Sequence, residues 1–213
     1  MKYQTQRRIF VIGASVAVTL LVASCAITPN VDGPTFAGAG SSWTNQLRNS
    51  GSFGNGTTQA TARSLGEQTW QGRKVRAIEL PQGIRLSDAT TGAWLAVVKD
   101  GQTLNTWEPS LGYDWPLTVG KSFAKDFRFV NHVTNQAFDI RSTMTVESYE
   151  TVTVAAGTFK AFKVRYTDAA TEILSWYSPD VGGWVKNQTK RNGSHPAGPG
   201  TQETELLSYS LKK

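Results

Sequence analysis

The carboxylates that could act as an acid–base pair are few and scattered along the chain. Glu147 with Glu150, and Asp114 with Asp126, supply the residue types that glycoside hydrolysis requires. Spacing in sequence does not fix the distance between two carboxylates, and Glu147 falls on the water-facing side of an alternating strand pattern. We therefore interpret these carboxylates as surface residues and not as a catalytic pair.

The two histidines offer no better site. His132 lies in an Asn-bounded segment and His195 in a segment rich in Gly and Pro, and neither has a cluster of ligand-type residues beside it. The short motifs of serine hydrolases, zinc proteases, phosphate-binding loops and dinucleotide folds do not occur. The sequence thus predicts no catalytic residue, no metal, no cofactor and a protein that is not an enzyme.

Cys25 is the only cysteine, so its thiol has no disulfide partner within the chain. Upstream of it lie three basic residues, Lys2, Arg7 and Arg8, and then an uncharged apolar run over residues 9–22. This order is typical of a secretory signal, and the run is shorter than the roughly 20 residues that cross a bilayer as a helix. We expect export and cleavage before Cys25.

Residues 22–25, Val-Ala-Ser-Cys, resemble the lipobox of bacterial lipoproteins, whose cysteine takes a diacylglycerol and becomes the new N-terminus. The alternative is an ordinary signal peptide with a cysteine at its cleavage site. Two or three acyl chains, palmitate among them, would anchor the protein stably because each buried methylene contributes about 0.8 kcal/mol. The residue after the cysteine is Ala26. An aspartate at this position would resemble the retention signal of inner-membrane lipoproteins, so alanine favours the outer membrane. We expect a lipid on Cys25 and a cell-envelope location, at the outer membrane facing the periplasm.

Composition divides the chain into a signal over residues 1–24, a lipidated cysteine and flexible linker over 25–40, and one domain over 41–213. The linker is rich in Pro, Gly, Ala and Thr and has no hydrophobic period. Removing the signal leaves 19 basic against 16 acidic residues, with no basic cluster. This weak charge and the exported location argue against nucleic acid as a partner.

Hydrophobic alternation predicts an all-β domain. The clearest strand runs from Phe138 to Val146, and a turn at residues 155–157 joins two strands into a hairpin. Asp100-Gly101 is a second turn of the two-residue type. Further strands are expected over residues 43–50, 58–70, 73–80, 93–99, 103–108, 125–133, 173–178, 184–191 and 204–211.

Many consecutive strands with short connections favour an antiparallel meander that curls into a strongly curved sheet or open barrel, with a two-layer sandwich as the alternative. The strand from Trp94 to Val98 is apolar on both faces, which indicates either a filled core or a lined cavity.

Four blocks of the C-terminal two-thirds carry a family resemblance. In order they are WPLTVGKSF (115–123), VTVAAGTFKAFK (152–163), WYSPDVGGWVK (176–186) and LSY (207–209). Together they resemble the TapB-like family of envelope β-domains. The resemblance implies a secreted or lipoprotein all-β domain of largely undefined role, and it implies no catalytic residue set.

Two function classes follow. The first is a non-enzymatic envelope module that binds a protein or the cell wall through strand edges or loops, the Gly- and Pro-rich segment from Asn192 to Gln202 among them. The second is a carrier or sensor that encloses a lipid or other apolar ligand. Trp176, Tyr177 and Trp184 are the candidate contact residues, although aromatic rings at such positions also build cores.

Overall fold

The computed structural model describes residues 29–212, so the predicted signal, Cys25 and its lipid lie outside the described residues. These described residues form strands and turns without a helix, which confirms the all-β prediction. The strands are β1 (Asn30–Val31), β2 (Ser42–Gly51), β3 (Gly56–Trp70), β4 (Arg73–Leu80), β5 (Gly83–Asp88), β6 (Trp94–Lys99), β7 (Gln102–Leu111), β8 (Leu117–Thr118), β9 (Ser122–Ala124), β10 (Phe127–Asn131), β11 (Gln136–Ile140), β12 (Thr143–Val154), β13 (Gly157–Thr167), β14 (Thr171–Ser178), β15 (Gly183–Arg191) and β16 (Gly200–Ser210).

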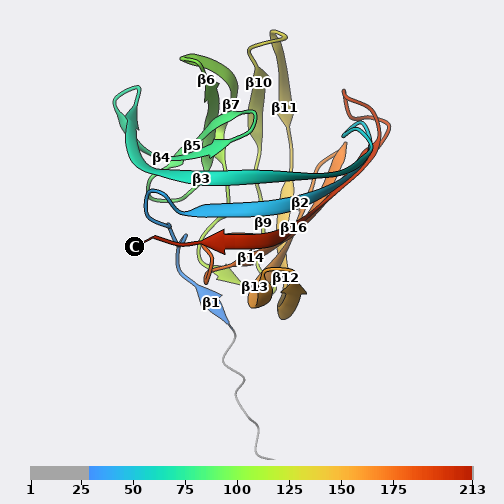
Figure 1. The fold of residues 1–213 in the computed structure, drawn as a ribbon. Helices are drawn as coiled ribbons and strands as arrows, with labels where there is room; N and C mark the ends of the chain where they lie inside the picture. The colour runs from blue at the N-terminus through green and yellow to red at the C-terminus, as the bar shows by residue number, and fades with distance from the viewer. Residues whose placement is uncertain (1–28, 213) are drawn as a thin grey trace, which may run out of the picture.

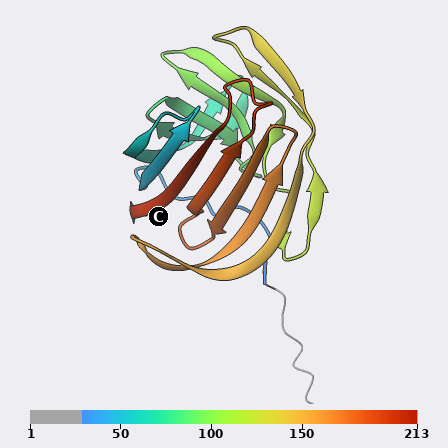
Figure 2. The same cartoon turned by 90° about the vertical axis from the view of Figure 1, so that its right-hand side faces the viewer.

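Fourteen of these strands form one antiparallel sheet, in the order β11-β10-β7-β6-β5-β4-β3-β2-β16-β15-β14-β13-β12-β9. The remaining two, β1 and β8, pair with each other. Figures 1 and 2 show that the large sheet curls strongly, which leaves one concave and one convex face. The predicted curved sheet is confirmed, and the sandwich alternative is not what the chain adopts.

The sheet is not closed, because β11 and β9 are its two edges. Both edges belong to one long two-stranded arm. In this arm β9 is followed by β10 on one side and β11 by β12 on the other, so that β9 pairs with β12 and β10 pairs with β11. The arm is interrupted at residues 125–126 and 141–142, where the amide of Lys125 donates to the carbonyl of Ser142 at 2.9 Å. On one side of this interruption β10 pairs with β7, and on the other β12 pairs with β13. The arm therefore changes neighbours and spans the seam between the two ends of the sheet.

This interruption corrects the predicted continuous strand from Phe138 to Val146. The alternation itself is right, because Ile140 and Met144 face the concave side while Asp139 and Thr143 are exposed. Two strands replace one because the arm changes its pairing partner at residues 141–142, a tertiary event that the period-two pattern does not register.

The predicted turns are confirmed. Lys99 pairs with Gln102 across Asp100 and Gly101, whose φ angles of 50° and 76° fit a type I′ hairpin turn. Val154 pairs with Gly157 at the β12–β13 turn. The segment from Asn192 to Gln202, by contrast, is a loop only in its first part, because β16 already begins at Gly200.

Apolar clusters cover parts of the convex face. One lies under the tip of the β12–β13 hairpin, where the amide of Ala156 donates to the carbonyl of Leu206 at 3.1 Å. Its buried members are Val152, Val154, Phe159, Ala161, Trp176, Val181, Val185 and Leu206. Another joins β4, β5 and β6 through Val75, Ala77, Leu86, Leu95 and Ala96. These clusters supply most of the core outside the cavity, and Trp43, which packs against the first of them, also lines the cavity.

Residues 30–40, which the sequence assigns to a flexible linker, lie against the domain. Asn30 and Val31 pair with Thr118 and Leu117, and the amide of Gly40 donates to the carbonyl of Ser64 at 2.8 Å. The segment shows no hydrophobic period because it follows the sheet as irregular chain held at single points. Within the described residues, no helix has the length and apolar character needed to span a bilayer.

Candidate functional site

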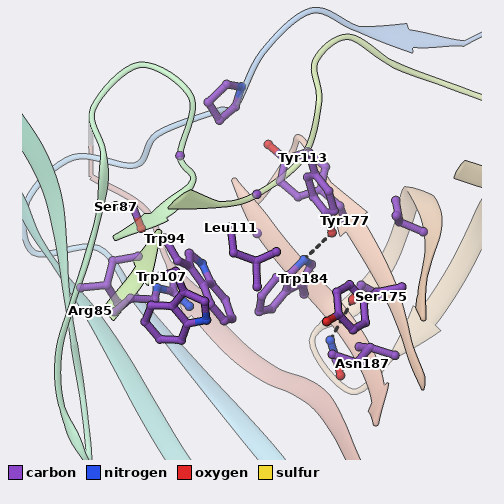
Figure 3. A pocket seen from close by; sticks show the side chains of 18 of the residues that line it. Arg85, Ser87, Trp94, Trp107, Leu111, Tyr113, Ser175, Tyr177, Trp184 and Asn187 are labelled. Carbon is purple, nitrogen blue, oxygen red and sulfur yellow. Dashed lines mark hydrogen bonds between the residues drawn. The ribbon is translucent and has the colours of Figure 1, made fainter. Parts of the chain in front are cut away.

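A cavity of about 670 Å³ occupies the concave side of the sheet. Its volume lies within the range of roughly 300–1,000 Å³ that is usual for small-molecule sites. Figure 3 shows aromatic side chains on two opposite walls, with Arg85 and Ser87 on one wall and Ser175 and Asn187 on the other. A mostly apolar lining with isolated polar groups is typical of a ligand pocket.

A row of aromatic rings crosses the cavity. Trp94 of β6 lies edge to face against Trp107 of β7, with ring centroids 5.7 Å apart, and against Trp184 of β15, at 5.6 Å. Phe129 of β10 extends the row beyond Trp107 at 5.4 Å. Such pairs contribute about 0.5–1.5 kcal/mol each beyond the area they bury. The row therefore ties the β6–β7–β10 wall to the β15 wall.

A second aromatic group continues from Trp184. Its indole Nε1 donates to the hydroxyl of Tyr113 at 2.8 Å, and Tyr113 lies edge to face against Trp115 and Tyr177 at 5.7 and 5.9 Å. Burial raises the pKa of Tyr113 well above its usual range, so this hydroxyl stays protonated. Next to Tyr113, a buried cluster fills the concave face with Leu117, Met144, Val146, Phe162, Val164 and Tyr177. Tyr113, Trp115 and this cluster form the floor of the cavity.

The β14–β15 wall supplies neutral polar groups. The Asn187 side-chain Nδ2 donates to the Ser175 hydroxyl at 2.9 Å, and the Thr189 hydroxyl donates to the Asn187 side-chain Oδ1 at 3.0 Å. Gln202 and Thr204 of β16 extend this side of the lining. The interior is thus divided between aromatic rings and uncharged hydrogen-bonding side chains.

Arg85 of β5 brings a positive charge to the aromatic wall. Its guanidinium carbon lies 4.9 Å from the centroid of the Trp94 ring, a cation–π distance. Its Nε is buried and has no hydrogen-bond partner among the described residues. Burial lowers the pKa of Arg85 to about 10, which leaves the group charged at neutral pH.

The N-terminal segment passes along the cavity. The amide of Thr35 donates to the Tyr177 hydroxyl at 3.0 Å, and the Phe36 ring lies 4.8 Å from the guanidinium carbon of Arg76. Pro34, Thr35 and Phe36 all contribute to the lining. The chain that leads back toward Cys25 is therefore in direct contact with the candidate site.

The three aromatic residues predicted as contacts are not together. Tyr177 and Trp184 face the cavity and lie side by side, because they are paired with each other between β14 and β15. Trp176 points to the opposite face because successive strand residues alternate. It is 8% exposed within the convex cluster, and its Nε1 donates to Glu150 at 2.7 Å.

The residues considered for acid–base chemistry lie away from the cavity. Glu147 accepts from Arg165 at 2.5 Å and pairs with Lys163 at 3.1 Å, and these groups hold its pKa below the usual range. Hydrogen bonds from Ser148 and Trp176 do the same for Glu150. Asp114 pairs with Lys121 at 3.2 Å. His132 bonds Thr106, and His195 accepts from a backbone amide in its own loop.

Among residues 29–212, no group of three or more His, Cys, Asp or Glu side chains is arranged to hold a metal ion.

Sequence reasoning missed β5 and, with it, Arg85. The signal was present, because Ile84 and Leu86 alternate with Arg85 and Ser87 directly after the turn at residues 81–82. The alternation indicates a strand, but it predicts that the Arg85 side chain faces solvent. A polar residue that faces a cavity gives the same sequence pattern as one that faces solvent.

No family model and no curated protein matches the sequence. Solved structures of similar architecture include a protein of Bacteroides fragilis described as exported and of YmcC-like fold (TM-score 0.49, 13% identity, covering 84% of this chain and 100% of that one). Others are a protein of Parabacteroides distasonis described as a lipoprotein (TM-score 0.41, 11%, 84% and 100%) and the hypothetical lipoprotein YmcC of Escherichia coli (0.44, 12%, 81% and 86%). At these scores and identities the likeness carries no argument about function, and the resemblance to the TapB-like family has no support from a family model.

Proposed function

We propose that this protein is a non-enzymatic envelope lipoprotein that binds an apolar ligand on the concave side of its curved sheet. The cavity of about 670 Å³ crossed by Trp94, Trp107 and Trp184 carries the proposal. Large aromatic side chains normally fill a core, whereas here they border open space. Of the two function classes the sequence leaves open, the carrier or sensor is the one that a cavity favours.

The pKa values of the carboxylates considered for acid–base chemistry support a non-enzymatic role. Glycoside hydrolysis needs one protonated carboxylic acid at working pH, which requires a raised pKa. The pKa values of Glu147 and Glu150 are both lowered, and both groups are engaged by basic or hydrogen-bonding neighbours on the face away from the cavity.

Attachment to the membrane through Cys25, with the domain on the periplasmic side of the outer membrane, is a second part of the proposal and rests on the sequence of residues 22–26. Radioactive palmitate should label the full chain and fail to label Cys25→Ser. Labelling of the variant, or a wild-type chain that is soluble without detergent, would refute the anchor.

Binding of an apolar ligand is tested with the neutral dye N-phenyl-1-naphthylamine, which fluoresces in apolar surroundings. The protein is the exported full chain carrying Cys25→Ser, stripped of bound molecules over a hydrophobic resin. We expect saturable binding of one dye per chain, with energy transfer from the cavity tryptophans. Absence of saturable binding to folded protein would overturn the proposal.

A blocked cavity provides the matched comparison. Thr204 lines the cavity on β16, whereas Thr201 lies three residues away on the same strand and is exposed. Thr204→Trp fills part of the cavity and should abolish dye binding, while Thr201→Trp adds the same ring outside and should leave it unchanged. Equal binding by the two variants, both shown to be folded by circular dichroism, would place the dye elsewhere.

A second candidate function, contact with another envelope protein, is favoured by the β10–β11 hairpin. β11 is a sheet edge, and Val133 beside it is 72% exposed. An exposed edge strand offers unpaired backbone groups to a partner strand. A photo-crosslinker at position 133 in living cells should capture one defined partner, and an equivalent probe at exposed Thr153 should not. The same products from both positions would count against this role.

A further inference from the structure

Arg85 is unusual among the charged residues that line the cavity, because no carboxylate of the described residues lies within ion-pair distance of it. Its side chain extends from β5 toward the Trp94 and Trp107 rings, as Figure 3 shows. The ring of Trp94 supports one side of the guanidinium, but a π face accepts no hydrogen bond along the edge where the N–H groups point. The buried Nε is left without a partner.

The other three charged residues of the lining are already engaged. Asp168 accepts from the Tyr166 hydroxyl at 2.6 Å and from the amides of Ala170 and Thr171 at 2.7 Å. Lys186 pairs with Glu205 at 2.9 Å and its ammonium lies 5.9 Å from the Trp176 ring, on the opposite face of the sheet. Arg76 reaches Glu67 at 3.9 Å, although its own buried Nε also has no hydrogen-bond partner among the described residues. Arg85 is therefore the one charged residue of the lining that has neither an ion-pair partner nor a hydrogen bond at its buried Nε among the described residues.

A buried cation is costly unless an anion or several acceptors compensate it. The planar guanidinium presents its N–H donors in a fork that matches an oxyanion such as a carboxylate or phosphate. An anion brought by the ligand would complete the site, and the neighbouring tryptophans would enclose the ligand's apolar part.

We propose that the ligand is an anionic amphiphile, a hydrocarbon chain ending in a carboxylate or phosphate, whose oxyanion binds Arg85 while the chain lies along Trp94, Trp107 and Trp184. This inference rests on the proposed function, since it assigns the chemistry of a ligand for the same cavity. It adds a direction to binding: the head group is at the β5 wall, and the chain extends toward the floor made by Tyr113 and Tyr177.

Three probes of equal chain length test the assignment, namely laurate, dodecyl phosphate and the neutral lauryl alcohol. Each displaces N-phenyl-1-naphthylamine from the exported full chain carrying Cys25→Ser. We expect at least one of the two anions to bind about 10-fold or more tightly than the alcohol, because a hydrogen bond to a charged group contributes about 1.5–3 kcal/mol. Which anion binds more tightly identifies the head group as carboxylate or phosphate.

Arg85→Gln keeps a polar side chain and removes the charge. It should weaken binding of the preferred anion roughly 10- to 100-fold and weaken binding of the uncharged alcohol and dye far less, because neither carries a charge that pairs with Arg85. Arg85→Lys should fall in between, because it restores the charge without the planar fork. Arg128→Gln, which removes an exposed arginine paired with Asp139 at 2.9 Å on the outside of the sheet, is the control and should change nothing.

The outcomes separate the two claims. If the dye binds but the anions and the alcohol compete equally, and Arg85→Gln alters none of them, the anionic head group is wrong while the apolar site stands. If neither dye nor amphiphile binds the folded wild type, the cavity is not a ligand site and both claims fail. Selective loss of anion binding in Arg85→Gln, with dye binding retained, supports the inference.

Discussion

Trp94 of β6 and Trp184 of β15 meet edge to face, with ring centroids 5.6 Å apart and ring planes at 64°. Their strands belong to opposite halves of the sheet order, separated by β5, β4, β3, β2 and β16. Contact between them therefore joins the two walls across the concave side and limits how far the sheet can open. The stability of the fold and the shape of the cavity should depend on the same rings.

The hydrogen bond from Trp184 to Tyr113 should be measurable as a coupling. Trp184→Phe keeps an aromatic ring but removes the Nε1 donor 2.8 Å from the Tyr113 hydroxyl, and we expect a loss of about 1 kcal/mol in the free energy of unfolding. Urea denaturation of Trp184→Phe, Tyr113→Phe and the double variant gives the pairwise term. Strictly additive losses would show that the bond contributes nothing. Trp70→Phe, on half-buried Trp70 at the end of β3, controls for the loss of an indole.

Two adjacent glycines test the contact between the N-terminal segment and the cavity. Gly182 has φ of 61°, and a Cβ there would lie 2.6 Å from the carbonyl oxygen of Thr35, whereas a Cβ at Gly183 would meet nothing within 4 Å. Gly182→Ala should cost about 1 kcal/mol or more and loosen the Thr35 amide from Tyr177.

Hydrogen exchange reports this loosening directly. The Thr35 amide should exchange faster in Gly182→Ala than in wild type, with Gly183→Ala close to wild type. Unchanged protection of Thr35 in Gly182→Ala would mean that the segment adapts without losing its contact.

The ion pairs of Glu147 predict how stability changes with pH. The hydrogen bond from Arg165 and the nearby Lys163 lower the pKa of Glu147 below its ordinary value of 4.5. The unfolded chain therefore takes up the proton first, so the stabilisation is complete above pH 4.5 and is lost as pH falls through the lower folded-state pKa.

Glu147→Gln should accordingly lower the free energy of unfolding at pH 7 by a few tenths of a kcal/mol to about 1 kcal/mol, and by less at pH 3. Denaturant titrations at the two pH values make the comparison, with Glu79→Gln, which changes an exposed carboxylate on β4, as control. An equal deficit for Glu147→Gln at both pH values would contradict the assignment.

Alternation along the chain was enough to predict the strand composition, the β12–β13 hairpin and the Asp100-Gly101 turn, because each depends on residues close in sequence. The interruption at residues 141–142 was not predictable in this way, since it arises where the arm exchanges β7 for β13 as neighbour. Local patterns record which face a residue takes and leave out which strand lies beside it.

The cavity was harder to foresee for a related reason. Arg85 and Ser175 alternate with apolar neighbours as if they faced solvent, and Asn187 lies in a polar run, while in the structure all three face the interior of a curved sheet. Trp176 and Tyr177 show the converse, because adjacent aromatics suggest one platform but point to opposite faces. Whether a polar strand face lines a cavity or meets solvent depends on how the sheet curls, which local sequence does not record.

Whether the cavity holds a ligand is decided by native mass spectrometry of the exported full chain carrying Cys25→Ser, purified without detergent and before any stripping of bound molecules. We expect a reproducible added mass of one molecule per chain that extracts into organic solvent and that Thr204→Trp lacks. A folded wild-type chain with the bare protein mass, which also fails to take up added amphiphile, would contradict this expectation.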